Sequence, residues 1–533
     1  MRRNSFIQGA LILTVAGIIV KFIGAFSRIY LSRLLGGEGI GLYQMAYPIY
    51  LLCLSVSSAG LPVAISIMVA ERNAVNDYRG GQKVFHISMT ALTITGLLFS
   101  GLLFFGARWL VDSGLVRDPR AYWSLLALSP AILCATLLAT LRGYFQGLQL
   151  MTPTAVSQIV EQIVRVVTMI ALAVFMMQYG LEYGAAGATF GAAPGAVFGI
   201  LVLMVFFFLT KSWRKELALQ QDPRILPQRA PQIIKKLLYL AIPVSLANIM
   251  LPITSNIDLF IVPKRLEVAG FSVEEATTFF GYLTGMATSL VNMPTIVTAS
   301  LAASLVPAIS EAVAKNSRDV IFKRTDTAMR LANILTIPSF IGMCVIATPI
   351  SAMLYAIPDA GPCIAVMSFG VFLLGVQQVT TGVLQGMGKT AIPFINMVIS
   401  ALVKIVLSWN LTSIPSLGVL GAAWATNADF GVAAVLNLYF LWKHEKYMMD
   451  IVHTSKLFIA AGCMGAAVLG VYQFTIQMIP SNTLTTLIAI ITGSVIYGAA
   501  IILLRCVRPE DVRGIPKIGG VLERTVIRFG MKK

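Results

Sequence analysis

Long apolar runs follow one another along the whole chain, separated by short polar connections. Each run has about 20 residues, which as a helix is enough to cross about 30 Å of hydrocarbon. The pattern therefore predicts an all-α polytopic membrane protein with fourteen transmembrane helices. These are expected at 6–30, 40–69, 84–107, 120–141, 154–177, 185–210, 237–262, 278–303, 326–350, 361–384, 391–412, 419–442, 457–478 and 482–504.

The chain also contains an internal repeat. RGYFQGLQLMTPTAVSQIVEQIVR (142–165) is followed 239 residues later by TGVLQGMGKTAIPFINMVISALVK (381–404), so Arg165 answers Lys404. Weaker echoes relate LPVAIS (61–66) to LVPAIS (305–310) and GAAGA (184–188) to GVLGA (418–422). A repeat in a hydrophobic chain is typical of transporters built from two similar halves.

The repeat suggests a division of the chain into four parts. Six helices form an N-terminal lobe (1–210) and six form a C-terminal lobe (237–445), joined by a basic linker (211–236). The remaining segment (446–533) holds two further helices and a basic tail. Because six helices separate equivalent segments, we expect the lobes to be related by a rotation about the membrane normal.

Composition supports a membrane location, since 57% of the 533 residues are hydrophobic and only 12% are charged. The net charge of +17 does not indicate nucleic acid, because Lys and Arg gather in alternate connections. That bias places both termini and the linker in the cytoplasm. The opposite connections hold only Arg33, Arg108, Arg117, Arg120, Lys264 and Arg265.

Several charges fall inside predicted helices, where each costs about 2.5–3.5 kcal/mol on the insertion scale and calls for a reason. Lys21 and Arg28 are seven residues apart, hence on one helical face and roughly 10 Å apart along the axis. A paired cationic face suits a ligand with two negative centres, such as a diphosphate. Alternatively, Arg28 reaches the outer surface and Lys21 serves packing.

A second group of charges lies in the repeated segment. Glu161 and Arg165 are one turn apart and could simply neutralise each other, or could contact a substrate. Lys404 has Ser400 at the preceding turn, so its charge is met across helices or by a ligand. We count Glu161, Arg165 and Lys404 with Lys21 and Arg28 as candidate substrate-binding residues, the cations engaging a diphosphate in a chamber between the lobes.

Two intramembrane acids are candidates for ion coupling. Asp258 lies on the expected seventh helix and Asp429 on the twelfth, beside Asn427. Either could hold a coupling proton or cation, and Asp258 could instead pair with Lys21 or Arg28. We expect no catalytic residue, metal or bound cofactor, with energy from the membrane potential or an H⁺ or Na⁺ gradient.

A nucleotide as the energy source is not indicated. GVLQGMGKT (382–390) ends like a P-loop, but Val383 stands where the first glycine is needed and no strand precedes it. Six scattered cysteines with no CxxC pair indicate neither a metal site nor disulfides.

The segments RLLGGEGIGLYQMAYPIY (33–50) and 142–165 resemble the multidrug/oligosaccharidyl-lipid/polysaccharide (MOP) exporter superfamily. Within it, the chain looks like the polysaccharide-biosynthesis branch and its stage V sporulation protein B group, related to MurJ-type lipid II flippases. The resemblance implies two six-helix bundles around a cationic cavity and two added helices that form a groove for a polyprenyl tail.

It also implies transport of a lipid-linked cell-wall precursor from the inner to the outer leaflet of a bacterial cytoplasmic membrane. The chain departs from the arginine pattern of such flippases. Lys21 takes the first arginine position of helix 1, and Arg28 lies one place beyond the second, at Ser27. Leu52–Cys53 and Ser289 stand where helices 2 and 8 carry arginines. These departures bear on the substrate more than on the fold.

We therefore expect a flippase for an undecaprenyl-diphosphate-linked precursor such as lipid II, acting as a monomer by alternating access. One alternative is a flippase for another polyprenyl-linked polysaccharide. Another is a multidrug antiporter, although an exporter of organic cations should have an acidic cavity. A membrane glycosyl- or acyltransferase is a more remote alternative, because no DxD pair or large loop is present.

Overall fold

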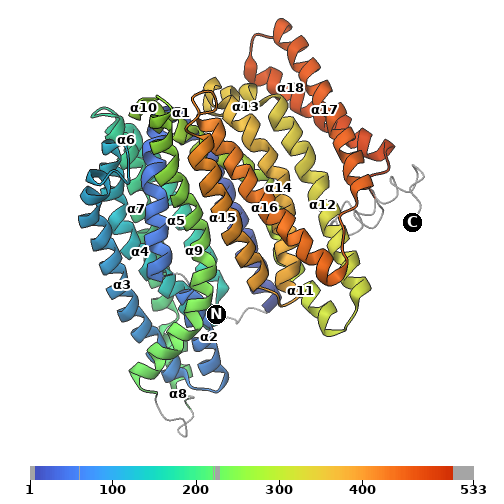
Figure 1. The fold of residues 1–533 in the computed structure, drawn as a ribbon. Helices are drawn as coiled ribbons and strands as arrows, with labels where there is room; N and C mark the ends of the chain where they lie inside the picture. Colours follow the sequence, from blue (N-terminus) through green and yellow to red (C-terminus); the bar gives the residue numbers. More distant parts are fainter. Residues whose placement is uncertain (1–5, 59, 220, 222–227, 508–533) are drawn as a thin grey trace. The chain divides into compact units, whose positions relative to one another are not determined.

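The computed structural model describes residues 6–58, 60–219, 221 and 228–507. In that part of the chain every regular element is a helix (Figure 1). The α-helices are α1 (Phe6–Ser58), α2 (Leu61–Ala74), α3 (Tyr78–Asp112), α4 (Tyr122–Gly147), α5 (Met151–Met177), α6 (Leu181–Phe190), α7 (Ala192–Leu209), α8 (Lys211–Leu219), α9 (Ala230–Val268), α10 (Val273–Phe280), α11 (Thr288–Ala314), α12 (Arg318–Val345), α13 (Ala347–Tyr355), α14 (Gly361–Gly386), α15 (Ala391–Leu411), α16 (Val419–Glu445), α17 (Ile451–Met478) and α18 (Asn482–Leu503). Short 3₁₀ turns precede α4 and α14, and a π-helical segment, Gly281–Ala287, precedes α11.

This is an all-helical polytopic membrane fold. Twelve helical stretches of the described residues are long and apolar enough to cross a membrane. One of them, 63 residues long, covers both of the first two expected helices, and α9 covers the expected seventh. Fourteen transmembrane helices therefore stay a prediction.

The 63-residue stretch is not one straight helix. Gly36 interrupts α1 with φ 69° and ψ −174°, a conformation that only glycine adopts without strain. A second interruption falls at Gly60, whose φ of 75° precedes α2. The expected boundary between helices at 30–40 thus corresponds to a kink at Gly36, and the expected helix over 40–69 ends and restarts near Gly60.

Several helices extend beyond their apolar runs. α3 begins at Tyr78 rather than 84, because the Asp77 side chain accepts a hydrogen bond from the backbone N–H of Gly80 and caps the helix. α12 begins at Arg318 rather than 326, after Ser317. Other expected helices are divided, as at Gly191 between α6 and α7 and at Ile346 between α12 and α13. Polar helix ends outside the hydrocarbon account for the first kind of difference.

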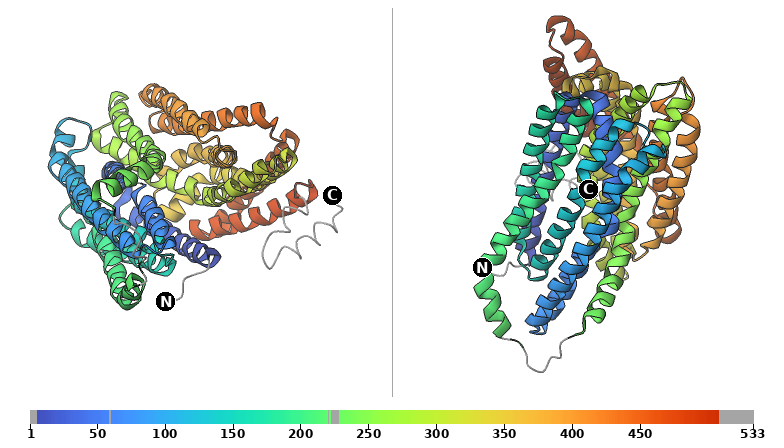
Figure 2. Two further views of the ribbon diagram at one scale, coloured as in Figure 1. Left: turned by 90° about the horizontal axis from the view of Figure 1, so that it is seen from below. Right: turned by 90° about the vertical axis from the view of Figure 1, so that its left-hand side faces the viewer.

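The chain forms two compact units, each described here by itself. The first comprises Met1–Lys264 and Val273–Gly281, and the second comprises Arg265–Ser272 and Tyr282–Lys533. Within each unit the long helices run roughly side by side (Figure 2). These units are defined by the contacts between residues and not by the sequence repeat. The division of the chain into an N-terminal and a C-terminal lobe therefore stays a prediction.

In the first unit α4 is central, packing against α1, α2, α3, α6 and α7. A buried cluster joins α2, α3, α4, α7 and the start of α9, with Tyr144, Phe145 and Ile65 among its members. Asn256 of α9 donates to the carbonyl of Pro48 at 2.9 Å, which joins α9 to the second part of α1.

In the second unit α14 has the corresponding place, packing against α11, α12, α13 and α16. The two C-terminal helices belong to this unit: α17 packs on α12 and α18 on α13. Tyr497 of α18 donates to the carbonyl of Ile334 at 2.8 Å, and Asn482 donates to that of Pro349 at 3.0 Å. The basic tail beyond residue 507 lies outside the described residues.

The repeat is visible in local geometry. α4 and α14 both have 26 residues, and each is followed by a left-handed residue, Gln149 with φ 59° and Gly388 with φ 76°. Asn76 and Asn316 likewise have φ of 60° and 50° in the turns that end α2 and α11. The same helix-ending turns therefore recur at the same places in the two halves.

One of the weaker sequence matches between the two halves does not coincide with the structural match. A side chain at Gly143 would meet the carbonyl of Pro62, and one at Gly382 would meet that of Ala302. These contacts match α2 to α11 with an offset of 240 residues, whereas LPVAIS and LVPAIS match at about 244. The sequence match was wrong by one helical turn, which keeps the same helix face and so keeps a similar apolar pattern.

Candidate functional site

A buried ion cluster joins α4 and α5 in the first unit. The Glu161 carboxylate receives Arg142 Nη2 on one oxygen and Arg165 Nη2 on the other, both at 2.7 Å. All three side chains are largely shielded, with exposed fractions of 15–26%. Two arginines share one carboxylate, so the cluster carries a net positive charge within the membrane-spanning helices.

Neighbouring residues hold this cluster in place. Arg142 Nε donates to Ser157 Oγ at 3.0 Å, and Ser157 lies one turn before Glu161 on α5. α7 approaches closely at Gly195, where a Cβ would lie 2.9 Å from both Arg165 Cβ and the Glu161 carbonyl oxygen. Gly195 therefore has no room for a side chain against these two residues.

Three tyrosines of α1 line the same region. Tyr43 and Tyr47 stack with ring centroids 5.4 Å apart, and the ring of Tyr50 lies 5.7 Å from that of Tyr47. Arg165 lies within electrostatic range of the hydroxyl groups of all three tyrosines, and Arg28 lies within range of that of Tyr43. Arg28 and Arg165 are therefore both near Tyr43.

The remaining helix-1 candidate occupies a different environment. Lys21 is exposed, whereas Arg28 is partly buried. Phe22 and Phe26, which flank Lys21 on the helix surface, are 63% and 69% exposed. An exposed cation among exposed aromatic side chains remains a candidate for contact with a bound anion, and its role stays a prediction.

The second unit places a buried cation at the equivalent position. Lys404 of α15 is only 2% exposed and is among the largest fully buried side chains. One turn earlier, Ser400 donates to Asp429 of α16 at 2.5 Å. The expectation that the charge of Lys404 is met across helices is consistent with a carboxylate at this interface, and Asp429 is itself buried.

Amide and hydroxyl groups continue this polar interface along α14, α15 and α16. Asn396 donates to Asn437 at 2.8 Å, and Asn437 donates to Thr380 and Thr381 at 3.2 and 3.0 Å. Thr381 stands where the first half has Arg142. The second half therefore has neutral hydrogen bonds where the first half has an ion pair.

The other acid, Asp258, lies on α9 and is 9% exposed. Asn256, two residues earlier, bonds to the carbonyls of Pro48 and Pro252 and so fixes this part of α9. Coupling roles for Asp258 and Asp429 stay predictions, as does the shared chamber for Lys21, Arg28 and Lys404.

Sequence reasoning missed Arg142 and the tyrosines. Arg142 opens the first copy of the repeat, and its absence from the second copy was a usable signal. Tyr43, Tyr47 and Tyr50 follow the i, i+4, i+7 spacing that places side chains on one helical face. In both cases the sequence contained a signal, but it did not show which residues these side chains contact in the folded protein.

Comparison with known proteins identifies the family of this chain. The model of the family described as "Polysaccharide biosynthesis protein" matches residues 6–313, and the MatE model matches residues 283–410. Stage V sporulation protein B of Bacillus subtilis (strain 168) is 30% identical over 98% of this chain and 100% of its own length. Lipid II flippase MurJ of the same organism is 26% identical over 87% of this chain and 88% of its own.

A solved structure has the same fold. The inward closed conformation of the lipid II flippase MurJ superposes with a TM-score of 0.68 at 17% identity, covering 93% of this chain and 99% of that one. The sequence matches extend over nearly the whole chain, including the ion cluster and its equivalent in the second half. The chain therefore belongs to the polysaccharide biosynthesis protein family of the MOP superfamily, whose members are multi-pass membrane transporters and flippases.

Proposed function

We propose that this protein is a flippase that moves an undecaprenyl-diphosphate-linked cell-wall precursor, such as lipid II, from the inner to the outer leaflet. The observation that carries the proposal is the cationic cluster around Glu161, where two buried arginines share one carboxylate. Anionic ligands compensate such an excess of buried positive charge. The relatives named stage V sporulation protein B and lipid II flippase support this substrate class.

The cations of the candidate site have distinct roles in this proposal. Arg28 and Arg165 grip diphosphate oxygens with their planar guanidinium groups, and Lys21 and Lys404 act as point charges. Glu161 keeps Arg165 oriented while the site is empty. Lys404 belongs to the second unit. The proposed mechanism is alternating access.

Energy comes from an ion gradient or the membrane potential rather than from ATP. Asp258 and Asp429 are buried carboxylates on membrane-spanning helices. A carboxylate in such a place binds a proton or Na⁺ in one conformation and releases it in another. The protein acts as a monomer in a bacterial cytoplasmic membrane, with both termini in the cytoplasm. Labelling of cysteines at Gln220 and Pro480 from the same side would contradict this orientation.

The decisive experiment identifies the lipid that accumulates on the cytoplasmic side when the protein is depleted. Lipid II accumulation supports the specific substrate, and another polyprenyl-linked glycan supports the broader flippase. Drug sensitivity without such accumulation would favour an antiporter, which the MatE match makes the second candidate. A loss of glycosyl or acyl transfer in washed membranes would instead favour an enzyme.

The site is tested by complementation combined with membrane abundance. Lys21→Ala and Arg28→Ala proteins should be made in normal amounts yet fail to support export, because each lacks a cation for the diphosphate. Arg28→Lys should be partly tolerated. Lys235→Ala, at an exposed position of α9, is the matched control and should export normally. Normal export by the alanine variants, or failure only through degradation, would make these cations structural.

A further inference from the structure

An open pocket lies where α7 ends and α8 begins. It has about 520 Å³ of empty space. Its lining consists of two aromatic residues, three cations and one amide: Phe207, Phe208, Lys211, Arg214, Lys215 and Gln82. Among the residues that the structure describes, no carboxylate lines it, so the described lining carries positive charge beside an aromatic wall.

Arg214 is the fixed charge of this pocket. It is 9% exposed, its guanidinium carbon lies 3.5 Å from the centroid of the Phe207 ring, and its Nη2 donates to the Phe207 carbonyl at 2.6 Å. Its buried Nε finds no acceptor among the described residues. The guanidinium also hydrogen-bonds the Tyr144 side chain. Its buried Nε is still unused by the described residues, and burying such a donor is costly unless an anion approaches the group.

A second basic pocket, between α11 and α12, provides a comparison. It has about 790 Å³ of empty space and contains Lys323 and Arg324. There the protein supplies its own anion, because Arg324 Nη2 lies 3.6 Å from a carboxylate oxygen of Glu311 and Nη1 bonds to the Ala308 carbonyl. Within the described part of the chain, the pocket around Arg214 has no carboxylate partner of this kind, which favours a ligand from outside the chain.

The position of the pocket indicates what kind of anion it takes. The membrane-spanning stretch Leu181–Leu209 ends at this point, and Phe208 and Leu209 are 63% and 70% exposed. Exposed aromatic and aliphatic side chains at a span end face acyl chains, and the cations that follow lie at the level of the headgroups. A free phosphate would contact only the cations of the pocket. A lipid would contact the cations with its headgroup and the aromatic side chains with its acyl chains.

We propose that this pocket binds the phosphate headgroup of an anionic phospholipid from the leaflet on the linker side. Lys211 and Lys215 contribute point charges, Arg214 donates in a fixed direction, and the acyl chains lie along Phe208 and Leu209. The site is separate from the cluster around Glu161, and the proposal does not depend on the transported substrate.

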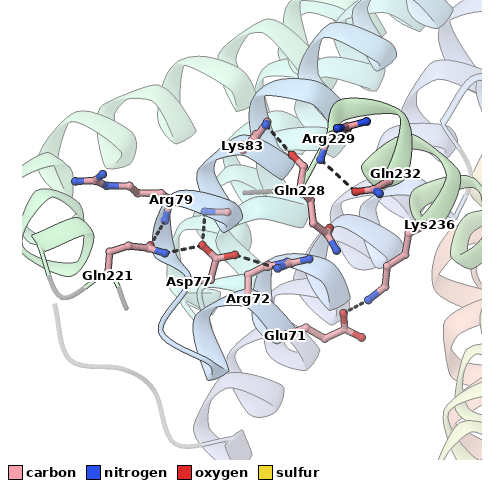
Figure 3. A network of polar contacts seen from close by, with 11 residues as sticks. Glu71, Arg72, Asp77, Arg79, Lys83, Gln221, Gln228, Arg229, Gln232 and Lys236 are labelled. Atoms are coloured by element: carbon pink, nitrogen blue, oxygen red, sulfur yellow. Dashed lines mark hydrogen bonds and ion pairs between the residues drawn. The ribbon is translucent and has the colours of Figure 1, made fainter. Parts of the chain in front are cut away.

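The site adjoins a polar network that holds both ends of the linker (Figure 3). Gln82 and Arg214 also line a smaller neighbouring pocket with Asn73 and Tyr78, at the turn between α2 and α3. Around that turn Asp77 accepts from Gln221 at 2.9 Å, Lys83 donates to the Gln228 carbonyl at 2.7 Å, and Lys236 pairs with Glu71. A lipid bound beside this network should therefore stabilise the linker region.

The test uses the full-length protein in detergent and counts bound dioleoyl-phosphatidylglycerol by native mass spectrometry over a concentration series. Phosphatidylcholine and inorganic phosphate are the comparison probes. The Lys211→Gln/Lys215→Gln protein should bind phosphatidylglycerol about tenfold more weakly, because each cation near an anionic headgroup contributes favourably. Both lysines are exposed, so this protein should fold and insert normally.

Matched controls decide the interpretation. Lys323→Gln, in the pocket that has its own carboxylate, should leave binding unchanged. Phe208→Ala should weaken lipid binding without affecting phosphate. Equal binding of phosphatidylcholine, unchanged binding by the double variant, or displacement of the lipid by millimolar phosphate would each overturn the proposal. The last result would assign the pocket to a soluble phosphate.

Discussion

The α4–α5–α7 bundle of the first unit and the α14–α15–α16 bundle of the second are built alike but charged differently. Both place a cation at the equivalent position of the repeat, Arg165 on α5 and Lys404 on α15. In the first bundle the carboxylate, Glu161, lies on the same helix as this cation. In the second, Ser400 stands at the equivalent place and the carboxylate, Asp429, comes from the neighbouring helix.

The room between neighbouring helices explains which helix carries the carboxylate in each bundle. The offset that relates Gly184 to Gly418 also relates Gly195 to Asp429. Gly195 lies so close to α5 that a Cβ would be 2.9 Å from Arg165 Cβ, and Asp429 instead reaches Ser400 across a wider gap. Both halves thus have a carboxylate within one turn of the repeated cation position: Glu161 on the same helix as Arg165, and Asp429 bonded to Ser400 one turn before Lys404.

The largest effect is expected from Glu161→Gln. Both arginines would lose their shared anion, and removing one partner of a buried pair costs about 3–5 kcal/mol. The thermal unfolding midpoint in detergent and the amount of protein in the membrane should both fall. Adding Arg165→Met should restore part of the stability, because it removes one uncompensated charge.

The control for this change is an ion pair at the surface. Glu311 bonds to Lys315 at 2.6 Å, one helical turn away, but both side chains are more than half exposed. Solvent and salt screen such a pair, so Glu311→Gln should leave stability unchanged. Similar losses in the two variants would show that burial around Glu161 does not set the cost.

The next effect in size is expected from Gly195→Ala, which tests the spatial argument directly. Its methyl group would meet the Glu161 carbonyl and the Arg165 side chain, and overpacking of this kind costs about 1–3 kcal/mol. Gly101→Ala on α3 is the control, because nothing lies within 4 Å of its added Cβ. If unfolding midpoints show that both variants are equally stable, the close approach of α7 does not explain the missing carboxylate.

A smaller effect is expected from Asp429→Asn. The amide oxygen would still accept the Ser400 hydrogen bond, so mainly the negative charge is lost. A hydrogen bond to a charged group exceeds a neutral one by about 1 kcal/mol, and only one cation lies at this position of the repeat. The thermal unfolding midpoint should fall much less than it does for Glu161→Gln. A larger fall than for Glu161→Gln would show that the negative charge of Asp429 matters more to stability than that of Glu161.

The smallest effect concerns the turns after α4 and α14. Gln149 adopts the left-handed conformation that glycine holds at the equivalent Gly388. Gln149→Gly should therefore stabilise the protein by about 0.5–1 kcal/mol, since a side chain is unfavourable there. Gly388→Ala should destabilise it through backbone strain alone, because the added Cβ has open space. An unfolding midpoint that does not rise for Gln149→Gly would contradict this.

The sequence predicted the helices and the repeat because both depend on local apolar pattern. It misplaced the helix starts at Tyr78, where Asp77 caps the helix, and at Arg318, where a polar first turn extends the helix beyond its apolar run. It also missed the divisions at Gly191 and Ile346, and it predicted a break between two helices where the structure has a kink at Gly36. Hydropathy detects how much of a segment is apolar, but it is insensitive to the direction of the backbone.

The candidate site was predicted only in part for a related reason. Glu161 and Arg165 were paired correctly because their contact is local, one turn along α5. Arg142 is 19 residues from Glu161 on a different helix, and Asp429 is 29 residues from Ser400. Such contacts depend on how helices are turned toward each other, which a single sequence does not reveal.

The crossing of the chain between the two compact units has a consequence for its evolution. Residues 273–281 follow α9, the first helix of the second half, in sequence, yet they pack with the first unit. Gly41 and Gly281 mark this contact, because a Cβ on either would lie within 2.2 Å of a backbone carbonyl of the partner segment. Two identical copies produced by gene duplication would each have been complete. Here α9 up to Lys264 and residues 273–281, which belong to the second half by sequence, pack with the first unit, so the compact units no longer coincide with the two copies of the repeat.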